Sequence, residues 1–393
     1  MDLKYKSYVG YWNSLLSLIL LFIFPPVILI KDLVLYSSNR KYSRINISAF
    51  SILFFYMLVI QLTRIPESDF YSHVIYYTSS NFKGFSIEFI WEGINWILAS
   101  VNFQFKTLFV IIWLSTIYFF WWSSLNKLNL LNIEVVLLTL FIPYFFMSLL
   151  QLTQQSVSIS VFFYGLVMIL VSKTKKDNMI GMIFAFSSIF IHLSTLFFLP
   201  LIFIKKYNFR LSSLIIILIL ALIISQFDSL DMFYRILSYL PQNSLFAKAF
   251  SVKLKSVSID GSDSQYALGL LVYIEAFILI LIGIIYYYRF PKAMKSLFII
   301  QIIILVMLIL FSQYTILALR YYLVFQFLKI FFYSFFFYDA NDVMPSIFKY
   351  LGYFFLSYFL FKFFTCFEDA PYDYFGIKST SDIVFFNLTK SLF

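Results

Sequence analysis

Polar side chains that could take part in catalysis stand beside long apolar segments at several places in this sequence. Asp69 and His73, four residues apart, could each accept a proton. His192 lies near the middle of an apolar run, and Arg64 and Arg320 each stand at the end of one. An ionisable residue at membrane depth indicates a functional site, and these residues are the candidates for one.

Each candidate also has a simpler interpretation. Asp69 and His73 could form an ion pair on an exposed helix, and His192 could be an interior histidine bonded to a backbone carbonyl. The two arginines could be interfacial anchors. A polar turn between two apolar segments contains three glutamines, Gln151, Gln154 and Gln155. Their amides could either bind a ligand or join helices by hydrogen bonds.

Motifs of several common enzyme classes are missing from the sequence. It contains no Walker loop, no dinucleotide-binding glycine pattern, no zinc-binding helix and no Gly-x-Ser-x-Gly elbow. Cys366 is the single cysteine among 393 residues, which excludes a disulfide framework and a multi-cysteine metal site. We therefore expect no cofactor and no metal. The formal charge of +10 is better explained by basic loops beside a membrane than by a nucleic-acid ligand.

The elements that must position these residues are membrane helices. Hydrophobic residues make up 62% of the chain and charged residues 12%, against roughly 45–50% and about 25% in soluble domains. The apolar runs lack the alternation of β-barrel strands. Hydropathy predicts single helices at 11–30, 48–63, 107–124, 132–151, 156–172, 211–226, 266–288, 296–312, 320–337 and 347–366.

Short basic loops orient these helices, because loops rich in Lys and Arg stay on the cytoplasmic side. All of them share that side only if the stretch 179–204 is a hairpin of two short helices, broken near His192. The alternative is one long tilted helix. A broken helix is tolerated at membrane depth only where protein or a water-filled cavity covers the loose backbone. The basic loops are 31–44, 173–176, 205–210 and 289–295.

The hairpin completes an all-α bundle of about twelve transmembrane helices and brings every candidate residue to its outer face. Residues 1–366 form the predicted transmembrane domain, with outer segments 64–106 and 227–265, and 367–393 is a tail. Within the first outer segment, the apolar stretch 87–101 is too short and too charged to cross, and predicts a re-entrant or interfacial helix.

Two other pairs of residues receive structural interpretations from the sequence. Glu88 and Glu92, one helical turn apart, would repel each other, which favours a water-exposed face over a ligand site. Trp121 and Trp122 close the helix 107–124 and are interpreted as part of an interfacial aromatic belt.

The order of these motifs resembles the EpsG family, the Wzy-like polymerases of bacterial exopolysaccharide, capsule and O-antigen. The resemblance spans about residues 10–335. Its motifs are Asp69-Phe70-Tyr71, the segment 87–101, Gln154-Gln155-Ser156, His192-Leu193-Ser194 and Arg320-Tyr321-Tyr322. Gln154 stands where the family usually has Arg. That difference removes a cation expected to meet a phosphate, and Arg64 or Arg320 would have to replace it.

The resemblance implies a multi-pass glycosyltransferase of GT-C-like fold in the bacterial cytoplasmic (inner) membrane. At the outer face it would polymerise repeat units carried on undecaprenyl diphosphate into O-antigen, capsule or exopolysaccharide. Asp69, His73 and His192 would be catalytic. The diphosphate and sugars would contact Arg64, Tyr71, Gln154, Gln155 and Arg320. Membrane lipid, a chain-length regulator and a flippase are the other partners that the resemblance implies.

Other activities remain open on the sequence alone. A lipid-linked oligosaccharide flippase would also have about a dozen helices, although it should carry charges near the bilayer midplane. An O-antigen ligase would use the same donor with a lipid A core acceptor. A membrane acyltransferase is a third alternative.

Overall fold

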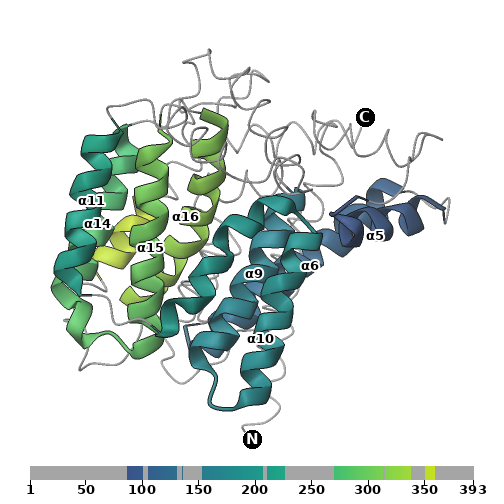
Figure 1. Ribbon diagram of the computed structural model, residues 1–393, viewed down its shortest axis with the longest axis horizontal. Coiled ribbons are helices and arrows are strands. Elements are labelled where there is room, and N and C mark those ends of the chain that lie inside the picture. The colour runs from purple at the N-terminus through teal and green to yellow at the C-terminus, as the bar shows by residue number, and fades with distance from the viewer. Residues whose placement is uncertain are drawn as a thin grey trace, which may run out of the picture.

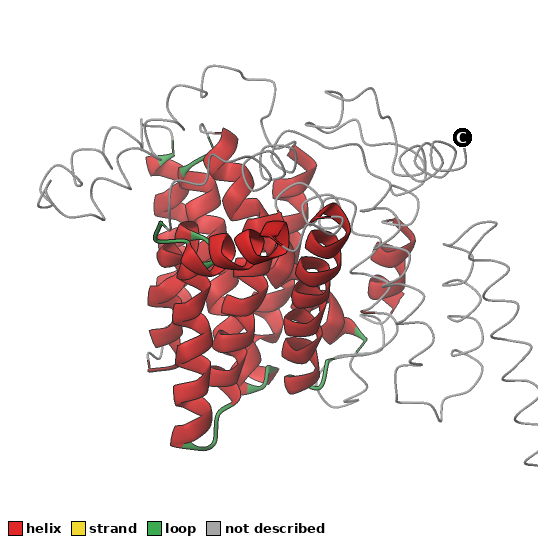
Figure 2. Cartoon of the chain, turned by 90° about the vertical axis from the view of Figure 1, so that its right-hand side faces the viewer, coloured by secondary structure: helices red, strands yellow, loops and turns green. Residues whose placement is uncertain are grey.

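The computed structural model describes residues 86–100, 105–130, 135, 153–206, 210–225, 270–312, 315–337 and 350–358. Within these ranges the chain is helical and has no strand, as the composition predicts (Figure 2). The predicted helices 11–30 and 48–63, most of 132–151, and the segment 227–265 lie outside the described residues.

The described helices follow the hydropathy pattern to within a few residues at each end. They are α5 (Phe89–Ser100), α6 (Phe105–Lys127), α9 (Thr153–Val171), α10 (Lys175–Ser187), η1 (Ser188–Phe190), η2 (Leu193–Lys206), α11 (Leu211–Ile224), α14 (Leu270–Tyr286), η5 (Tyr287–Arg289), α15 (Lys292–Leu310) and α16 (Thr315–Phe336). Residues 350–358 are also helical.

Three helices begin three to five residues earlier than predicted: α9 at Thr153 instead of 156, α15 at Lys292 instead of 296, and α16 at Thr315 instead of 320. Gln154 and Gln155 belong to the first turn of α9 rather than to the turn before it, and Arg320 lies in the second turn of α16. The first four N–H groups of a helix have no acceptor within the helix, so polar side chains are common at a start such as that of α9, whereas Arg320 is the sixth residue of α16 and lies beyond these groups. Hydropathy averages over such residues and therefore begins a helix too late.

The described helices form two neighbouring groups (Figure 1). Helices α6, α9 and α10 stand side by side, and α11, α14, α15 and α16 form the second group. Helix α5 lies at a steep angle to the upright helices, beside one end of α6, α9 and α10. This orientation agrees with the interfacial or re-entrant helix predicted for 87–101.

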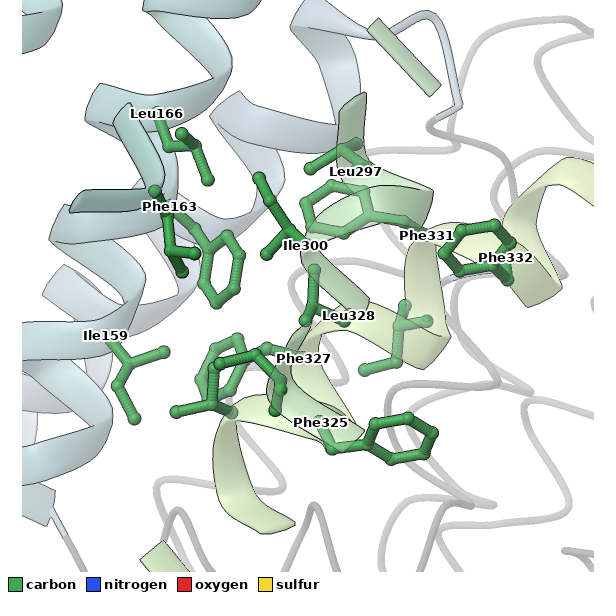
Figure 3. Packing of buried hydrophobic residues seen from close by; sticks show 14 of the residues in the cluster. Ile159, Phe163, Leu166, Leu297, Ile300, Phe325, Phe327, Leu328, Phe331 and Phe332 are labelled. Atoms are coloured by element: carbon green, nitrogen blue, oxygen red, sulfur yellow. The ribbon is translucent and has the colours of Figure 1, made fainter. Parts of the chain in front are cut away.

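The two groups meet through an aromatic and aliphatic core between α9, α15 and α16 (Figure 3). Phe163 of α9 stacks on Phe327 of α16, with ring centroids 6.1 Å apart. Trp121 is fully buried and packs against Phe327 and Phe331, each ring centroid lying 4.8 Å away. The interfacial-belt interpretation of Trp121 and Trp122 is therefore wrong: both indoles belong to the core.

Small residues allow α9 and α10 to approach each other closely. A Cβ atom added to Gly165 would lie 2.6 Å from the Ala185 nitrogen and 2.6 Å from the Gly181 carbonyl oxygen. Close backbone approach through small residues is a usual way for helices to associate in lipid, where the hydrophobic effect gives little driving force. This contact fixes α10 against α9.

The stretch 179–204 is a hairpin, as the basic loops predict. The Lys205 Nζ at the far end of η2 donates to the Ile169 carbonyl at 2.6 Å and to Ser172 Oγ at 2.8 Å, beside the loop where α10 begins. At the opposite end, Gln154 Nε2 donates to the Ile191 carbonyl at 2.8 Å. Helix α10 therefore runs away from the basic end, and η2 returns to it.

Two of the described helices, α9 and α15, are long and apolar enough to cross a membrane by themselves. Helix α11 and the segment Leu193–Lys205 are apolar but shorter. Together with the all-helical core, these helices agree with a helical membrane protein.

The hairpin makes a prediction about accessibility. In a Cys366→Ser background, Thr174→Cys and Arg210→Cys should react with a membrane-impermeant maleimide from the same side, because both exposed residues flank the hairpin at its basic end. Ser86→Cys, near the turn of the hairpin, should react from the opposite side. Labelling of positions 174 and 210 from opposite sides would mean that the stretch crosses once.

Candidate functional site

The site begins at Glu88, directly before α5. Ser86 Oγ accepts the Glu88 N–H at 3.1 Å and donates to Glu92 Oε1 at 2.7 Å, while the Ser86 N–H donates to Glu92 Oε2 at 2.6 Å. Glu92 is thus directed back to the start of its own helix, where a carboxylate is favourable. This arrangement keeps Glu92 away from Glu88 and leaves Glu88 to point into the bundle.

Glu88 meets the break in the hairpin. Its Oε1 lies 2.8 Å from His192 Nδ1 and accepts the Leu193 N–H at 2.8 Å. Its Oε2 accepts Gln154 Nε2 at 3.0 Å. The Glu88 side chain is only 19% exposed and that of His192 12%. The interpretation of Glu88 as part of a water-exposed, repelling pair is therefore wrong.

The same contacts satisfy the backbone where the helix is interrupted. Between η1 and η2, the Leu193 N–H is bound by Glu88 and the Ile191 carbonyl by Gln154. Outside regular helix, backbone groups left without partners in lipid would each cost several kcal/mol. Glu88 and Gln154 thus allow the chain to turn beside His192.

Buried hydroxyl groups support the turn from the interior side. Ser158 Oγ donates to the Ser188 carbonyl at 2.9 Å and lies 3.2 Å from Thr195 Oγ1, and Thr195 Oγ1 donates to the His192 carbonyl at 2.7 Å. Ser158, Ser188 and Thr195 are fully buried. These bonds hold the residues on both sides of His192 against α9, so the imidazole has a defined position.

The contact with Glu88 defines the chemistry available to His192. An ionised carboxylate can only accept hydrogen bonds, so the Nδ1 of a neutral imidazole beside it carries the hydrogen. The basic lone pair is then on Nε2, on the other side of the ring. A histidine oriented in this way by a carboxylate is the usual form of a general base.

Of the remaining predicted site residues, the structure describes Gln155 and Arg320. Gln155 is buried in α9, and the described residues give its Nε2 no partner. Arg320 is partly exposed, and the adjacent Tyr321 packs edge-to-face on Phe198 of η2 at 5.8 Å, which brings this turn of α16 against the hairpin. Arg64, Asp69, Tyr71 and His73 lie outside the described residues.

A second polar cluster, which the sequence analysis missed, joins α14 and α16. Lys329 Nζ lies 2.9 Å from Glu275 Oε1 and 3.0 Å from Oε2, and the Tyr333 hydroxyl donates to Glu275 Oε1. Lys329 is 2% exposed and Tyr333 fully buried. Both charges fall inside predicted membrane helices, where an ionisable residue is unusual. The rarity of ionisable residues in membrane helices could have identified Glu275 and Lys329 from the sequence, but only the structure shows that they pair.

Metal ligation has no support among the described residues, where no group of three His, Cys, Asp or Glu side chains could hold an ion. Within the described ranges, Glu88 is contacted by imidazole, amide and backbone groups. The described part of the site is therefore equipped for proton transfer and hydrogen bonding.

Comparison with known proteins matches most of the chain to a family. A family model described as the EpsG family matches residues 46–376, which include every described helix. No curated protein and no solved structure matches the chain.

The Glu275–Lys329 pair makes a prediction about stability. Glu275→Gln should destabilise the protein by about 3–5 kcal/mol, because it removes the charge of the Glu275 carboxylate from the buried Lys329 ammonium group. The exchanged double variant, Glu275→Lys with Lys329→Glu, should recover part of that loss.

Thermal unfolding of the purified protein in detergent measures both effects. Lys292→Gln is the matched control, because Lys292 is exposed at the start of α15. Equal unfolding temperatures for Glu275→Gln and Lys292→Gln would contradict the proposed contribution of the buried pair.

Proposed function

Because the chain belongs to the EpsG family, a family of Wzy-like polysaccharide polymerase-type proteins, we propose that it polymerises oligosaccharide repeat units carried on undecaprenyl diphosphate. The protein is then a membrane glycosyltransferase of the bacterial cytoplasmic membrane. Its product is O-antigen, capsule or exopolysaccharide. The observation that carries this proposal beyond the family is the Glu88–His192 pair, held with Gln154 at the turn of the hairpin.

The pair supplies the base that glycosyl transfer requires. An acceptor hydroxyl attacks the anomeric carbon of the growing chain, and the bond from that carbon to the diphosphate oxygen breaks. The hydroxyl proton passes to His192 Nε2, and Glu88 stabilises the imidazolium through Nδ1. Undecaprenyl diphosphate leaves with the bonding electron pair. No nucleotide sugar is needed, because the diphosphate is itself the leaving group.

The departing diphosphate requires positive charge near the same turn. Among the residues that the structure describes, Arg320 is the candidate for this charge, since its turn of α16 lies against η2. Arg64 is a second candidate. Asp69 and His73 keep the catalytic role, and Tyr71 the substrate contact, that the resemblance implies. Arginine suits this role because its fork of N–H groups matches phosphate oxygens.

The two glutamines receive different roles in this proposal. Gln154 donates through one nitrogen to both Glu88 and the Ile191 carbonyl, so it orients the carboxylate from within hydrogen-bonding distance. Any contact of Gln154 with sugar is additional to this role. Gln155 is buried, and a sugar could reach it only after the start of α9 moves.

A flippase is the alternative that a specific observation favours. Lys329 follows Arg320 by nine residues on α16, which at 1.5 Å per residue places it about 13–14 Å deeper along the helix. That depth is close to the middle of a bilayer core of about 30 Å, where transporters carry their charged sites. We favour the polymerase because Lys329 is already paired with Glu275.

The polymerase makes a prediction about Glu88. Replacing Glu88 by Gln should reduce polymer formation about a hundredfold or more, because the charged Glu88 carboxylate no longer stabilises the imidazolium. His192→Asn, Asp69→Ala and Arg320→Ala should have the same effect. Gel analysis of the surface glycan should show single repeat units in place of a ladder, with the variant protein still present in the membrane.

Glu92→Gln is the matched control, because Glu92 lies one turn further along α5 and its carboxylate is bonded to Ser86. This variant should keep its ladder. A normal ladder with Glu88→Gln would refute the base assignment. Transport of lipid-linked units across proteoliposomes, without their elongation, would instead indicate the flippase.

A further inference from the structure

We propose, on the premise of the polymerase function above, that an apolar stripe on α10 and η1 binds the polyprenyl chain of the lipid-linked substrate. The stripe, here called the α10 track, consists of Met179, Ile183, Phe186 and Phe190, and Phe89 of α5 closes its end. It would guide the membrane-embedded part of the substrate to Glu88 and His192.

The track is continuous and faces outward. Its four members follow at intervals of four, three and four residues, which aligns them on one side of a helix. They are between 37% and 58% exposed. Eleven residues of helix correspond to about 16 Å, enough for several isoprene units of an extended chain.

The track ends at the proposed catalytic pair. The Phe89 and Phe190 rings are in contact, with centroids 4.8 Å apart. Glu88 directly precedes Phe89, and His192 follows Phe190 by two residues. The polar side chains turn inward and bind each other, whereas the aromatic rings remain 45% and 37% exposed. One pair of rings therefore separates the polar site from the apolar surface.

This arrangement suits an amphipathic substrate better than bulk lipid. The diphosphate must lie at the polar site while its prenyl chain remains in the hydrocarbon layer, so the chain must leave the site across an apolar edge. Helix α11 also has an exposed apolar face, including Ile216, Ile219 and Ile223, but its described span carries no ionisable side chain. Only generic lipid contact is expected there.

The track would contribute binding and orientation rather than chemistry. Burial of apolar surface against the rings favours association of the prenyl chain. Because the chain is attached to the diphosphate, holding it on α10 restricts the positions that the diphosphate can occupy beside His192. Binding energy from this remote part of the substrate would thereby assist the reaction.

Photo-crosslinking tests the proposal. A benzoylphenylalanine is placed at position 183, 186 or 190 of the full-length protein in nanodiscs, and radiolabelled undecaprenyl diphosphate is the probe. Adducts should form at these positions, and unlabelled undecaprenyl diphosphate should compete with them whereas excess phospholipid should not. Positions 119 on α6 and 219 on α11, both exposed to a similar degree or more, are the controls.

Two results would overturn the proposal. Equal, non-competed adducts at the track and control positions would mean that α10 contacts only bulk lipid. Saturable adducts with benzoylphenylalanine placed at position 96 or 97, and none on α10, would mean that the prenyl chain leaves across α5, where Trp96 and Ile97 are also exposed.

Kinetics provide the second measurement. Phe186→Ala and Phe190→Ala should together raise KM for the undecaprenyl-linked substrate about tenfold, with a smaller decrease in kcat, since the track chiefly binds the chain and through it positions the diphosphate. Phe119→Ala should leave KM unchanged. An unchanged KM in the double variant would refute the role of the track.

The outcomes separate the two proposals. If wild-type protein elongates lipid-linked units but shows no saturable adduct on α10, the track is wrong and the polymerase stands. If saturable adducts form but the protein does not elongate lipid-linked units, the polymerase is wrong and a prenyl-diphosphate-binding surface remains.

Discussion

The interruption of the hairpin at Ile191 and His192 is the feature on which the site depends. Backbone groups that leave a helix inside the membrane must find partners in the protein, because lipid offers none. Glu88 binds the Leu193 N–H and Gln154 binds the Ile191 carbonyl. The same two side chains bind each other, and Glu88 also binds His192. The same hydrogen bonds therefore satisfy the interrupted backbone and orient the His192 imidazole.

Polar and apolar side chains are separated sharply around this interruption. Glu88 and His192 face each other, while the neighbouring rings of Phe89 and Phe190 meet at the surface. A substrate with a charged head and a hydrocarbon tail needs both environments within a few ångströms. The proposed reaction and the proposed prenyl track both depend on this arrangement, in which the start of α5 lies against the turn of the hairpin.

The rest of the described bundle is a scaffold for this end. Gly165 and Gly181 bring α9 and α10 into backbone contact, and Lys205 joins the returning η2 to the end of α9. Aromatic packing between Phe163 and Phe327 connects these helices to α16, the helix that carries Arg320 (Figure 3). The Glu275–Lys329 pair adds a polar link from α16 to α14, in a region where most other contacts are apolar.

The sequence by itself determined the helices of the described ranges, to within a few residues, and the hairpin, because hydropathy and the positions of Lys and Arg can be read along the chain without knowledge of spatial neighbours. It also singled out His192, Gln154 and Arg320 as polar residues beside apolar segments. It misjudged Glu88, Trp121 and Trp122, and it missed Glu275 and Lys329, since the partners of these side chains come from distant segments. Glu88 and His192 are 104 residues apart. Whether a carboxylate is solvated, repelled or paired depends on what folds against it, and only the tertiary structure decided that.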